Sequence, residues 1–431
     1  MKNILVVNNA NIILISRVIY GGYIVCEDGV ISEYGEGTYT VNPDDPQSYS
    51  LISKSFGGGL SPEEYDYTFI DAGGNYVSAG FIDIHTHGAG GFDFMDNTVE
   101  AYIGVAETHA KYGTTSLLPT TLASSNEELF KSLTVYKEAN ALNKKGSEFL
   151  GIHLEGPYFS DEQCGAQDPK YLRNPDPDEY NAILDFSDDI VRWSLAPELP
   201  GALDFGAKLR SRKILASIAH SNAIYEDIEN AFDVGFTHVT HLYSGMSTVT
   251  RRNAFRYAGV VEAAYLIDDM TVEIIADGVH LPKSLLQFAY KFKGADKIAL
   301  CTDSMRGAGM SDGESILGSL QNGQRVIIED GVAKLPDRSA FAGSVATADR
   351  LVRTMVQVAD VPLIEAVRMM TLTPARIIGK DLKGSITVEN DADLVIFDKQ
   401  ISVLSTIING KLVYNTLSNG SITTKNFSSA K

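Results

Sequence analysis

The middle of the chain alternates short apolar runs with stretches of helical pattern, and this alternation is the clearest structural signal in the sequence. Eight runs rich in β-branched or aromatic residues lie at 81–84, 115–118, 149–154, 191–195, 214–218, 237–240, 272–276 and 298–301. Strands that alternate with helices are typical of α/β proteins with a parallel sheet, and eight repeats indicate a (β/α)8 barrel of the TIM type. The predicted barrel domain spans residues 76–379.

Signals for helix boundaries fall between the apolar runs. Asn97 and Ser125 are each followed three residues later by Glu, which is the spacing of a capping box, and Gly113 and Gly235 follow helical patterns at positions where glycine often ends a helix. A doubly wound sheet is the alternative. Its first turn should carry a G-x-G-x-x-G pattern, but residues 85–91 begin with two histidines and lack it.

Both ends of the chain show short alternating strands with hairpin turns instead of helical pattern. The economical interpretation is one small β-sandwich domain built from both termini, residues 1–75 with 380–415. Within it, residues 36–66 are rich in Gly, Pro, Asp and Ser and are too long for an ordinary connection, so we expect an insertion there. The polar segment 416–431 is expected to be a flexible tail.

Charge and cysteine content exclude several classes of protein. The 431 residues carry 36 Lys and Arg against 55 Asp and Glu, and the net charge of −19 argues against nucleic-acid or anionic membrane partners. The three cysteines, Cys26, Cys164 and Cys301, lie far apart and favour neither a disulfide framework nor a cysteine-rich zinc module. Neither a signal peptide nor a membrane-spanning run is expected, so we predict a cytoplasmic protein.

Histidines and carboxylates gather at the carboxyl ends of the predicted strands, where barrel enzymes build their active sites. His85 and His87 end the first run, and because strand side chains repeat every two residues, both project to one side and can share a metal. The other residues at or just after strand ends are Glu155, His220, His241, His280 and Asp303. A divalent cation is the simplest charge that would compensate such a group.

A structural role is the alternative for each of these residues. A single histidine at a strand end is more often hydrogen-bonded in the core than a metal ligand, and only the convergence of several favours an ion. Three other histidines are expected to be structural or supporting. His109 lies within a helix, His238 is out of phase with His241, and His153 shares a face with Glu155 one layer deeper.

Seven short motifs follow one another along the chain. They are GFIDIHTHG (80–88), HLEGP (153–157), AHSNA (219–223), THLY (240–243), IADGVH (275–280), CTD (301–303) and FAGS (341–344). Together, over about residues 70–400, they resemble the N-acetylglucosamine-6-phosphate deacetylases of the amidohydrolase superfamily. The resemblance implies a metal-bearing (β/α)8 barrel flanked by a small β-sandwich from both termini, which agrees with the pattern of the sequence.

The resemblance also implies which residues hold metal. The ligands of one divalent ion would be Glu155, His220 and His241. A second ion can be held by His85 and His87, with Glu155 bridging the two and Asp303 nearby. Zinc and ferrous iron both suit such ligands, and the sequence does not choose between them or between one ion and two.

The implied reaction is hydrolysis of the N-acetyl amide of N-acetylglucosamine 6-phosphate, which gives glucosamine 6-phosphate and acetate. A metal lowers the pKa of its water toward ~7 and so supplies the nucleophile. Asp303 would take the proton from this water and return it to the departing amine. His280 would point at the acyl oxygen and stabilise the oxyanion.

The substrate-binding positions depart from the family pattern. The family usually has Asn-Ala after THLY, whereas this chain has Ser244 and Gly245, and it usually has a histidine where this chain has Gln167 after Ala166. Arg252 matches the family's phosphate-binding arginine, which reaches in from a neighbouring subunit, so a homodimer is expected. The alternative for this arginine is a solvated surface loop. The departures leave room for another N-acetyl amino sugar, phosphorylated or not.

Two further alternatives come from other classes. A cyclic amidase of the same superfamily would resemble members that need a bridging carboxylated lysine, but Glu155 stands at that position. A catalytically silent metal-binding scaffold would have no reason to keep Asp303 and His280 at the open face of the barrel.

Overall fold

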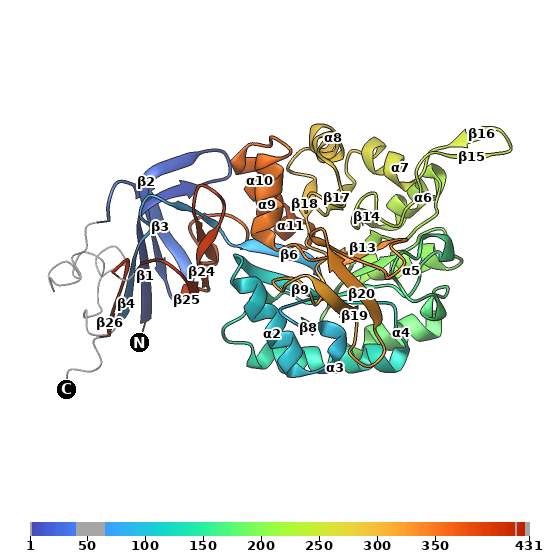
Figure 1. The fold of residues 1–431 in the computed structure, drawn as a ribbon, viewed down its shortest axis with the longest axis horizontal. Helices are drawn as coiled ribbons and strands as arrows, with labels where there is room; N and C mark the ends of the chain where they lie inside the picture. The colour runs from blue at the N-terminus through green and yellow to red at the C-terminus, as the bar shows by residue number, and fades with distance from the viewer. Residues whose placement is uncertain (1, 40–64, 419, 427–431) are drawn as a thin grey trace. The chain divides into compact units, whose positions relative to one another are not determined.

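The computed structural model describes residues 2–39, 65–418 and 420–426, and the chain divides into two compact units. One unit comprises Met1–Phe81, Ala110–Thr115 and Asp381–Lys431, and the other comprises Ile82–His109 and Ser116–Lys380 (Figure 1). The predicted boundaries near residues 75 and 380 lie close to these divisions. Most of the expected insertion at 36–66 lies outside the described residues.

The terminal unit is built around one connected sheet of nine strands. Its order is β25-β24-β23-β5-β1-β2-β3, with β4 paired to β1 and to β26. The strands are β1 (Lys2–Ile13), β2 (Val18–Glu27), β3 (Val30–Glu36), β4 (Tyr65–Asp71), β5 (Tyr76–Ala79), β23 (Leu394–Phe397), β24 (Val403–Ile408), β25 (Lys411–Asn415) and β26 (Ile422–Asn426). Strands from both termini are therefore neighbours in one sheet, while the sandwich arrangement stays a prediction.

Two details of this unit follow from its sequence. Strand β1 is apolar on both faces, because Leu5 and Val7 pack into one buried cluster and Ile4 and Val6 into another. The expectation of a flexible tail over 416–431 is wrong for β26, which pairs antiparallel with β4. Its three β-branched residues, Ile422, Thr423 and Thr424, suit a strand, a signal that the polar composition of the segment masked.

Eight parallel strands form the barrel of the second unit, and each of the eight predicted runs overlaps one of them. They are β6 (Phe81–Thr86), β9 (Thr114–Thr121), β11 (Ile152–Glu155), β12 (Ile190–Leu195), β13 (Leu215–Ile218), β14 (Phe236–Val239), β17 (Thr271–Ile274) and β18 (Ile298–Leu300). Successive strands are neighbours in this order, and the two-residue strand β10 (Glu148–Phe149) also pairs with β9. The prediction of a TIM-type barrel is confirmed.

The barrel closes where the end of β18 meets β6. The backbone N–H of Asp303 donates to the carbonyl of His85 at 2.9 Å. The Thr302 hydroxyl donates to Oδ2 of the buried Asp83 at 2.5 Å, and its backbone N–H reaches Oδ1 at 3.2 Å. Burial raises the pKa of Asp83 to about 7 despite these hydrogen bonds. This seam holds the His85–His87 segment against Asp303.

The helices cover the outside of the barrel (Figure 1). They are α2 (Val99–Ala110), α3 (Asn126–Leu142), α4 (Pro177–Phe186), α5 (Ala202–Ser211), α6 (Tyr225–Val234), α7 (Val260–Leu266), α8 (Lys283–Lys293), α9 (Ala348–Gln357), α10 (Leu363–Met369) and α11 (Leu372–Ile377). None of the helices in the described part of the chain is long and apolar enough to cross a membrane.

The helix-end predictions are mostly confirmed. The Ser125 hydroxyl caps α3, and Gly235 ends α6 with a positive φ of 122°. Gly113 lies in the turn just past α2, where φ is 88°. Asn97 does not cap α2, because the adjacent Thr98 hydroxyl accepts from the first turn while the Asn97 amide oxygen accepts from Ser132.

Two antiparallel excursions leave the barrel near its carboxyl-terminal mouth. A small sheet comprises β19 (Gly313–Leu317), β20 (Gln324–Glu329), β21 (Val332–Lys334) and β22 (Phe341–Ser344). The hairpin of β15 (Thr250–Arg252) and β16 (Phe255–Tyr257) projects outward from the rest of its unit (Figure 1).

Thr302→Val should destabilise the protein, because the valine cannot donate to the buried Asp83 carboxylate. An unsatisfied buried acceptor costs about 1–3 kcal/mol. Urea unfolding would measure this loss, with Thr302→Ser, which keeps the hydroxyl, as the matched control. Equal stability of the two variants would show that the hydroxyl does not hold the seam.

Candidate active site

A cavity of about 300 Å³ opens at the carboxyl ends of the barrel strands. Most of the predicted site residues line it, namely His87, Glu155, Ala166, Gln167, His220, His241, Ser244, Gly245, His280 and Asp303. His85 lies fully buried behind this wall, and Arg252 is not among the lining residues. Leu317 and Phe341, from the small β19–β22 sheet, add an apolar side.

Three of these residues adopt a left-handed backbone conformation just past their strands. The φ angles are 45° at His220, 27° at His241 and 45° at Asp303. Non-glycine residues rarely occupy this region, and such strain is typical of sites where the surrounding structure dictates the direction of a side chain. Here it ends the strand and turns each side chain toward the cavity, which no pattern in the sequence indicates.

Glu155, His220 and His241 form one candidate metal-binding group. The Glu155 Oε1 atom lies 3.1 Å from Nε2 of His241 and 3.5 Å from Nε2 of His220. One ligand atom from each residue lies within 4.8 Å of the others, and all three residues are buried. The structure therefore brings together the three residues expected to hold one ion.

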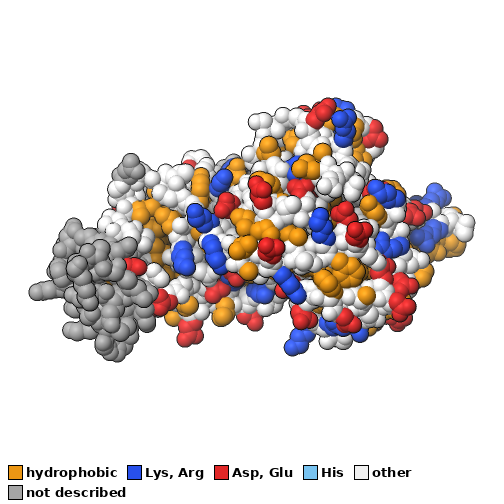
Figure 2. Space-filling model, turned by 90° about the horizontal axis from the view of Figure 1, so that it is seen from below, with side chains coloured by type: hydrophobic (Ala, Val, Ile, Leu, Met, Phe, Trp, Pro, Cys, Tyr) orange, Lys and Arg blue, Asp and Glu red, His pale blue; other side chains and the backbone are white. Residues whose placement is uncertain are grey.

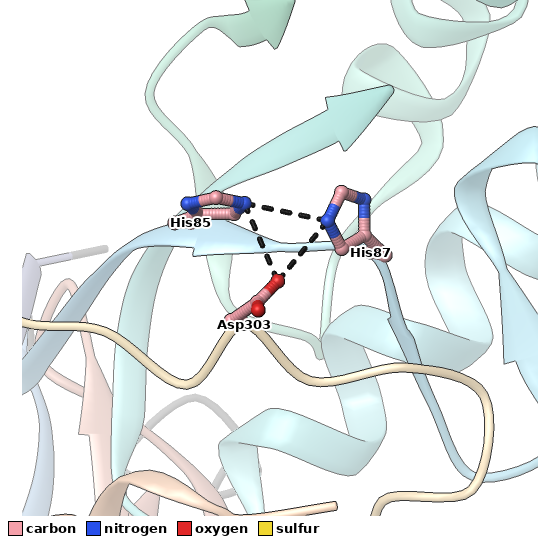
Figure 3. A group of neighbouring side chains, drawn as sticks. All are labelled: His85, His87 and Asp303. Atoms are coloured by element: carbon pink, nitrogen blue, oxygen red, sulfur yellow. Dashed lines mark hydrogen bonds and ion pairs between the residues drawn. The ribbon is translucent and has the colours of Figure 1, made fainter. Parts of the chain in front are cut away.

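His85, His87 and Asp303 form a second candidate group (Figure 3). The two Nε2 atoms are 3.3 Å apart, and Asp303 Oδ1 lies 3.4 Å from that of His85 and 3.2 Å from that of His87. Glu155 lies between the two groups, because Oε1 is 3.6 Å from His85 Nε2 and Oε2 is 3.5 Å from His87 Nε2. Its position suits a bridging carboxylate.

The histidine rings have the orientation of metal ligands. Nδ1 of His220 contacts the carbonyl of Gln163 at 2.7 Å, and Nδ1 of His87 contacts that of Thr120 at 3.2 Å. A carbonyl only accepts, so both Nδ1 atoms carry the proton and, in the neutral ring, both Nε2 atoms present lone pairs. These lone pairs face carboxylates, an arrangement that a divalent cation between them would satisfy.

The electrostatics of the metal-free site agree with this interpretation. Burial opposes ionisation of Glu155 and Asp303, but the charge of His85 and hydrogen bonds from the neighbouring histidines hold the pKa of both carboxyls below their ordinary values. Burial also lowers the pKa of His87, yet the hydrogen bond with Asp303 and the carboxylate charges outweigh it and raise the value to about 9. Both carboxylates are therefore ionised without metal, and a bound cation would take the place of the proton on His87.

His280 lines the same cavity, and its ring is fixed by Asp277. Nδ1 of His280 lies 2.7 Å from Asp277 Oδ2, and Oδ1 of Asp277 accepts from the backbone N–H groups of Val279 and His280. Burial raises the pKa of Asp277, but these bonds and the charge of His280 lower it below its ordinary value. The carboxylate therefore stays ionised and holds the ring of His280 in one orientation.

Gln167 and Gly245 lie against metal-site residues. Gln167 is buried, donates from Nε2 to Glu155 Oε2 at 2.7 Å and accepts from the backbone N–H of Ala123 at 2.9 Å. At Gly245, where φ is 58°, a Cβ atom would approach Nδ1 of His220 to 2.7 Å. Gln167 is thus held by protein groups at both ends of its amide, and a side chain at residue 245 would require the ring of His220 to shift.

Arg252 lies outside the cavity of its own chain, on the projecting hairpin of β15 and β16. The hairpin also carries Arg251, Arg256 and Phe255, whose side chain is 72% exposed. Figure 2 shows basic and hydrophobic side chains together at the end of the barrel unit where Figure 1 draws this hairpin. A surface of this kind is typical of a contact with another protein chain.

The remaining histidines do not line the cavity. His153 lies between the hydroxyls of Thr120 and Ser194, and burial holds its pKa well below the ordinary value. His238 contacts Thr271, and His109 contacts hydroxyls next to the barrel seam. Burial lowers the pKa of both His238 and His109 to about 4, so both are neutral.

Three supporting residues escaped the sequence analysis. Asp277 is in the IADGVH motif, three residues before His280, and this spacing could have identified it as a partner. Arg192 and Glu273 form a buried ion pair below the cavity. The signal for both was present, because each is the one charged residue in an apolar run that was predicted to be a barrel strand.

Comparisons with known proteins identify the family of the chain. The amidohydrolase family matches residues 76–413. N-acetylglucosamine-6-phosphate deacetylase of Haemophilus influenzae is 35% identical, over 79% of this chain and 87% of that protein. N-acetylgalactosamine-6-phosphate deacetylase of Escherichia coli O157:H7 is 31% identical, over 77% of this chain and 86% of that protein.

A solved structure gives the same result over nearly the whole chain. The crystal structure of N-acetylglucosamine-6-phosphate deacetylase from Pasteurella multocida superimposes with a TM-score of 0.82 at 30% identity and covers 95% of this chain and 99% of that one. The chain belongs to the amidohydrolase family, and its resemblance to the N-acetylglucosamine-6-phosphate deacetylases of that family is confirmed.

Removal of metal should lower the melting temperature of the protein, because the converging carboxylates and imidazoles lose the cation that satisfies them. A ligand present at 100 times its Kd stabilises the folded state by ~2.7 kcal/mol. Thermal melts before and after dialysis against a chelator, and after addition of Zn²⁺ or Fe²⁺, would measure the effect. Glu155→Gln is the control and should respond little. If the melting temperature of the wild type does not change on removal or addition of metal, the result contradicts a metal centre here.

Proposed function

We propose that the protein hydrolyses the N-acetyl amide of N-acetylglucosamine 6-phosphate and releases acetate and glucosamine 6-phosphate. One observation carries the proposal: Glu155, His220 and His241 converge on a cavity that also holds Asp303 and His280. The relatives named above support the same chemistry, because they deacetylate phosphorylated N-acetyl sugars.

The candidate ligands fit a divalent metal, zinc or iron, held by Glu155, His220 and His241, with His85, His87 and Asp303 available for a second ion. When bound, the metal supplies a water of lowered pKa and polarises the acetyl carbonyl. Asp303 accepts the proton as the water oxygen bonds to the acetyl carbon. Asp303 then returns this proton to the sugar nitrogen as the carbon–nitrogen bond breaks.

His280 supports the same step from the other side of the cavity. With Nδ1 engaged by Asp277, Nε2 of His280 is the atom that donates to the acyl oxygen as that oxygen gains negative charge. One such donor is typically worth about 3 kcal/mol of transition-state stabilisation. The cavity therefore offers a base and acid at Asp303 and an oxyanion donor at His280.

The substrate phosphate would be bound across a homodimer. Arg252 does not line the cavity of its own chain, and its hairpin projects outward with exposed hydrophobic and basic side chains. We infer that it reaches the cavity of a second copy, where Ser244 and the Gly245 backbone N–H complete the phosphate site. Local contact outweighs the net charge of −19, because the Debye length is ~8 Å at physiological salt.

A related amino sugar is the second candidate substrate. The contacts of Gln167 are the reason to test it. This side chain is held by Glu155 and by Ala123, so it cannot reach the sugar without giving up those bonds. The contact that a histidine makes to the sugar in the resembled family is therefore replaced or absent here. Ala166 and the Leu317 side of the cavity are the neighbours left to contact the ring.

Asp303→Asn should reduce acetate release by about 10²–10⁴-fold, because the amide cannot carry the proton from water to amine. The ion held by Glu155, His220 and His241 should stay bound, since its three ligands are unchanged. Acetate release and elemental analysis of the wild type and the variant would measure both quantities. Wild-type activity in the variant would refute the role of Asp303, and failure of the wild type to release acetate from any N-acetyl sugar would refute the proposed function.

The substrates compared in this assay should be N-acetylglucosamine 6-phosphate, its galactosamine epimer and N-acetylglucosamine without phosphate. We expect the phosphorylated glucosamine compound to be the best of the three. Faster turnover of the epimer would assign the protein to the second candidate substrate.

Mixing Asp303→Asn protein with Arg252→Ala protein should restore activity if Arg252 serves the partner's site. In a mixed dimer, the Arg252→Ala subunit keeps Asp303 and receives Arg252 from its partner, so one of the two sites is complete. Random exchange should recover roughly a quarter of the wild-type sites. The control is the same mixture assayed before subunit exchange. If dimers of verified size recover no activity after subunit exchange, Arg252 lies outside the active site.

A further inference from the structure

A buried ion pair lies in the barrel interior, next to the candidate metal groups. Arg192 on β12 and Glu273 on β17 are both 0% exposed. Nη2 of Arg192 donates to Glu273 Oε2 at 3.0 Å, and Nη1 donates to Oε1, so the contact is bidentate. Buried pairs of this kind are weak stabilisers compared with well-packed apolar residues. Its position beside the candidate ligands points to a further role.

Every donor of the Arg192 guanidinium has a partner. Besides Glu273, Nε donates to the Ser217 hydroxyl at 3.0 Å, Nη1 to the Ile84 carbonyl at 3.0 Å and Nη2 to the Thr240 hydroxyl at 2.8 Å. With five donors engaged, the plane of the guanidinium is fixed, and it holds the Glu273 carboxylate in one orientation.

The held carboxylate faces His85. Oε2 of Glu273 lies 3.3 Å from Nδ1 of His85, and it also lies 3.4 Å from the backbone nitrogen of His241. Because Nδ1 donates to the carboxylate, Nε2 of His85 is the free ligand atom, and it points toward His87, Asp303 and Glu155. His87 and His220 are oriented by backbone carbonyls, whereas His85 is oriented by a charged side chain.

We infer that Glu273 and Arg192 are positioning residues for the metal site of His85, His87 and Asp303. Glu273 fixes the ring and the tautomer of His85, and Arg192 fixes Glu273. The inference rests on the proposed function in one respect, because it takes His85 to be a metal ligand. Glu273 is not itself a ligand: both of its oxygens are engaged by Arg192, although Cys301 and His85 lie close enough to form a group with it.

A purely structural role is the competing interpretation, in which the pair only ties β12 to β17. The two interpretations differ in what a variant should lose. Loss of a positioning residue weakens the one metal site that contains His85, whereas loss of a structural tie lowers stability and affects both metal sites alike or neither.

The test is metal binding by Glu273→Gln, which keeps the size of the side chain and removes its charge. Metal-free protein is dialysed against buffered free Zn²⁺ over a range of concentrations, and bound zinc per chain is measured by elemental analysis. Wild-type protein should bind two equivalents. In Glu273→Gln the second equivalent should weaken by roughly 10- to 100-fold, and the first should keep its affinity.

Asp96→Asn is the matched control, because it breaks another largely buried carboxylate–arginine pair, with Arg306 at 2.7 Å, whose members contact none of the candidate ligands. It should bind both equivalents as the wild type does. His85→Asn removes the ligand itself and serves as the reference for complete loss of the second site. It should bind one equivalent of zinc.

Unchanged zinc binding by Glu273→Gln, or an equal weakening of both equivalents, would overturn the inference. If this variant does not fold, Arg192→Lys takes its place, because it keeps the charge but not the bidentate contact. Unchanged zinc binding by Arg192→Lys, or an equal weakening of both equivalents, would likewise overturn the inference. Failure of the metal assignment is distinguishable, because His85→Asn would then bind zinc like the wild type. A wild type that binds a single equivalent would remove the second metal site and this inference together.

Discussion

The site depends on the negative charges of Glu155 and Asp303, which lie buried at the carboxyl-terminal mouth of the barrel. Both carboxylates are almost completely buried, and the imidazoles beside them include those of His87 and His220, whose Nδ1 atoms already donate to backbone carbonyls. Carboxylates and imidazole lone pairs repel each other in this arrangement unless protons or a cation lie between them. A divalent ion satisfies all of them at once, and the two groups that share Glu155 explain how one or two ions could be held.

The sequence was most informative where periodicity and strand position act together. The eight apolar runs became strands, and because parallel strands end at one mouth, His87, Glu155 and Asp303 met there as predicted. What the sequence did not reveal depends on local backbone or on long-range contact. The left-handed φ at Asp303 has no pattern of its own. The pairing of Arg192 with Glu273 joins strands 81 residues apart in the chain.

The departures from the family pattern have a common physical consequence. At the position of the family's sugar-binding histidine, and at the position of the alanine that follows its phosphate-binding asparagine, this chain has residues that lie against the metal site. Gln167 donates to Glu155, and Gly245 leaves room for the ring of His220. Leu317 and Phe341, on the apolar side of the cavity, are left as surfaces that a sugar ring could contact. Substitutions at the metal site and at the substrate site are therefore linked in this protein.

The seam of the barrel links stability to chemistry in the same way. His85 lies near the end of the first strand, and Asp303 follows the eighth. A backbone hydrogen bond of 2.9 Å between them is one of the contacts that close the barrel. Asp83 and Thr302 hold that closure from one layer deeper, while Glu273 fixes the ring of His85. A barrel that opened at this seam would separate two of the candidate ligands before any other pair. The closing contacts of the fold and the geometry of the second metal group are therefore one set of interactions.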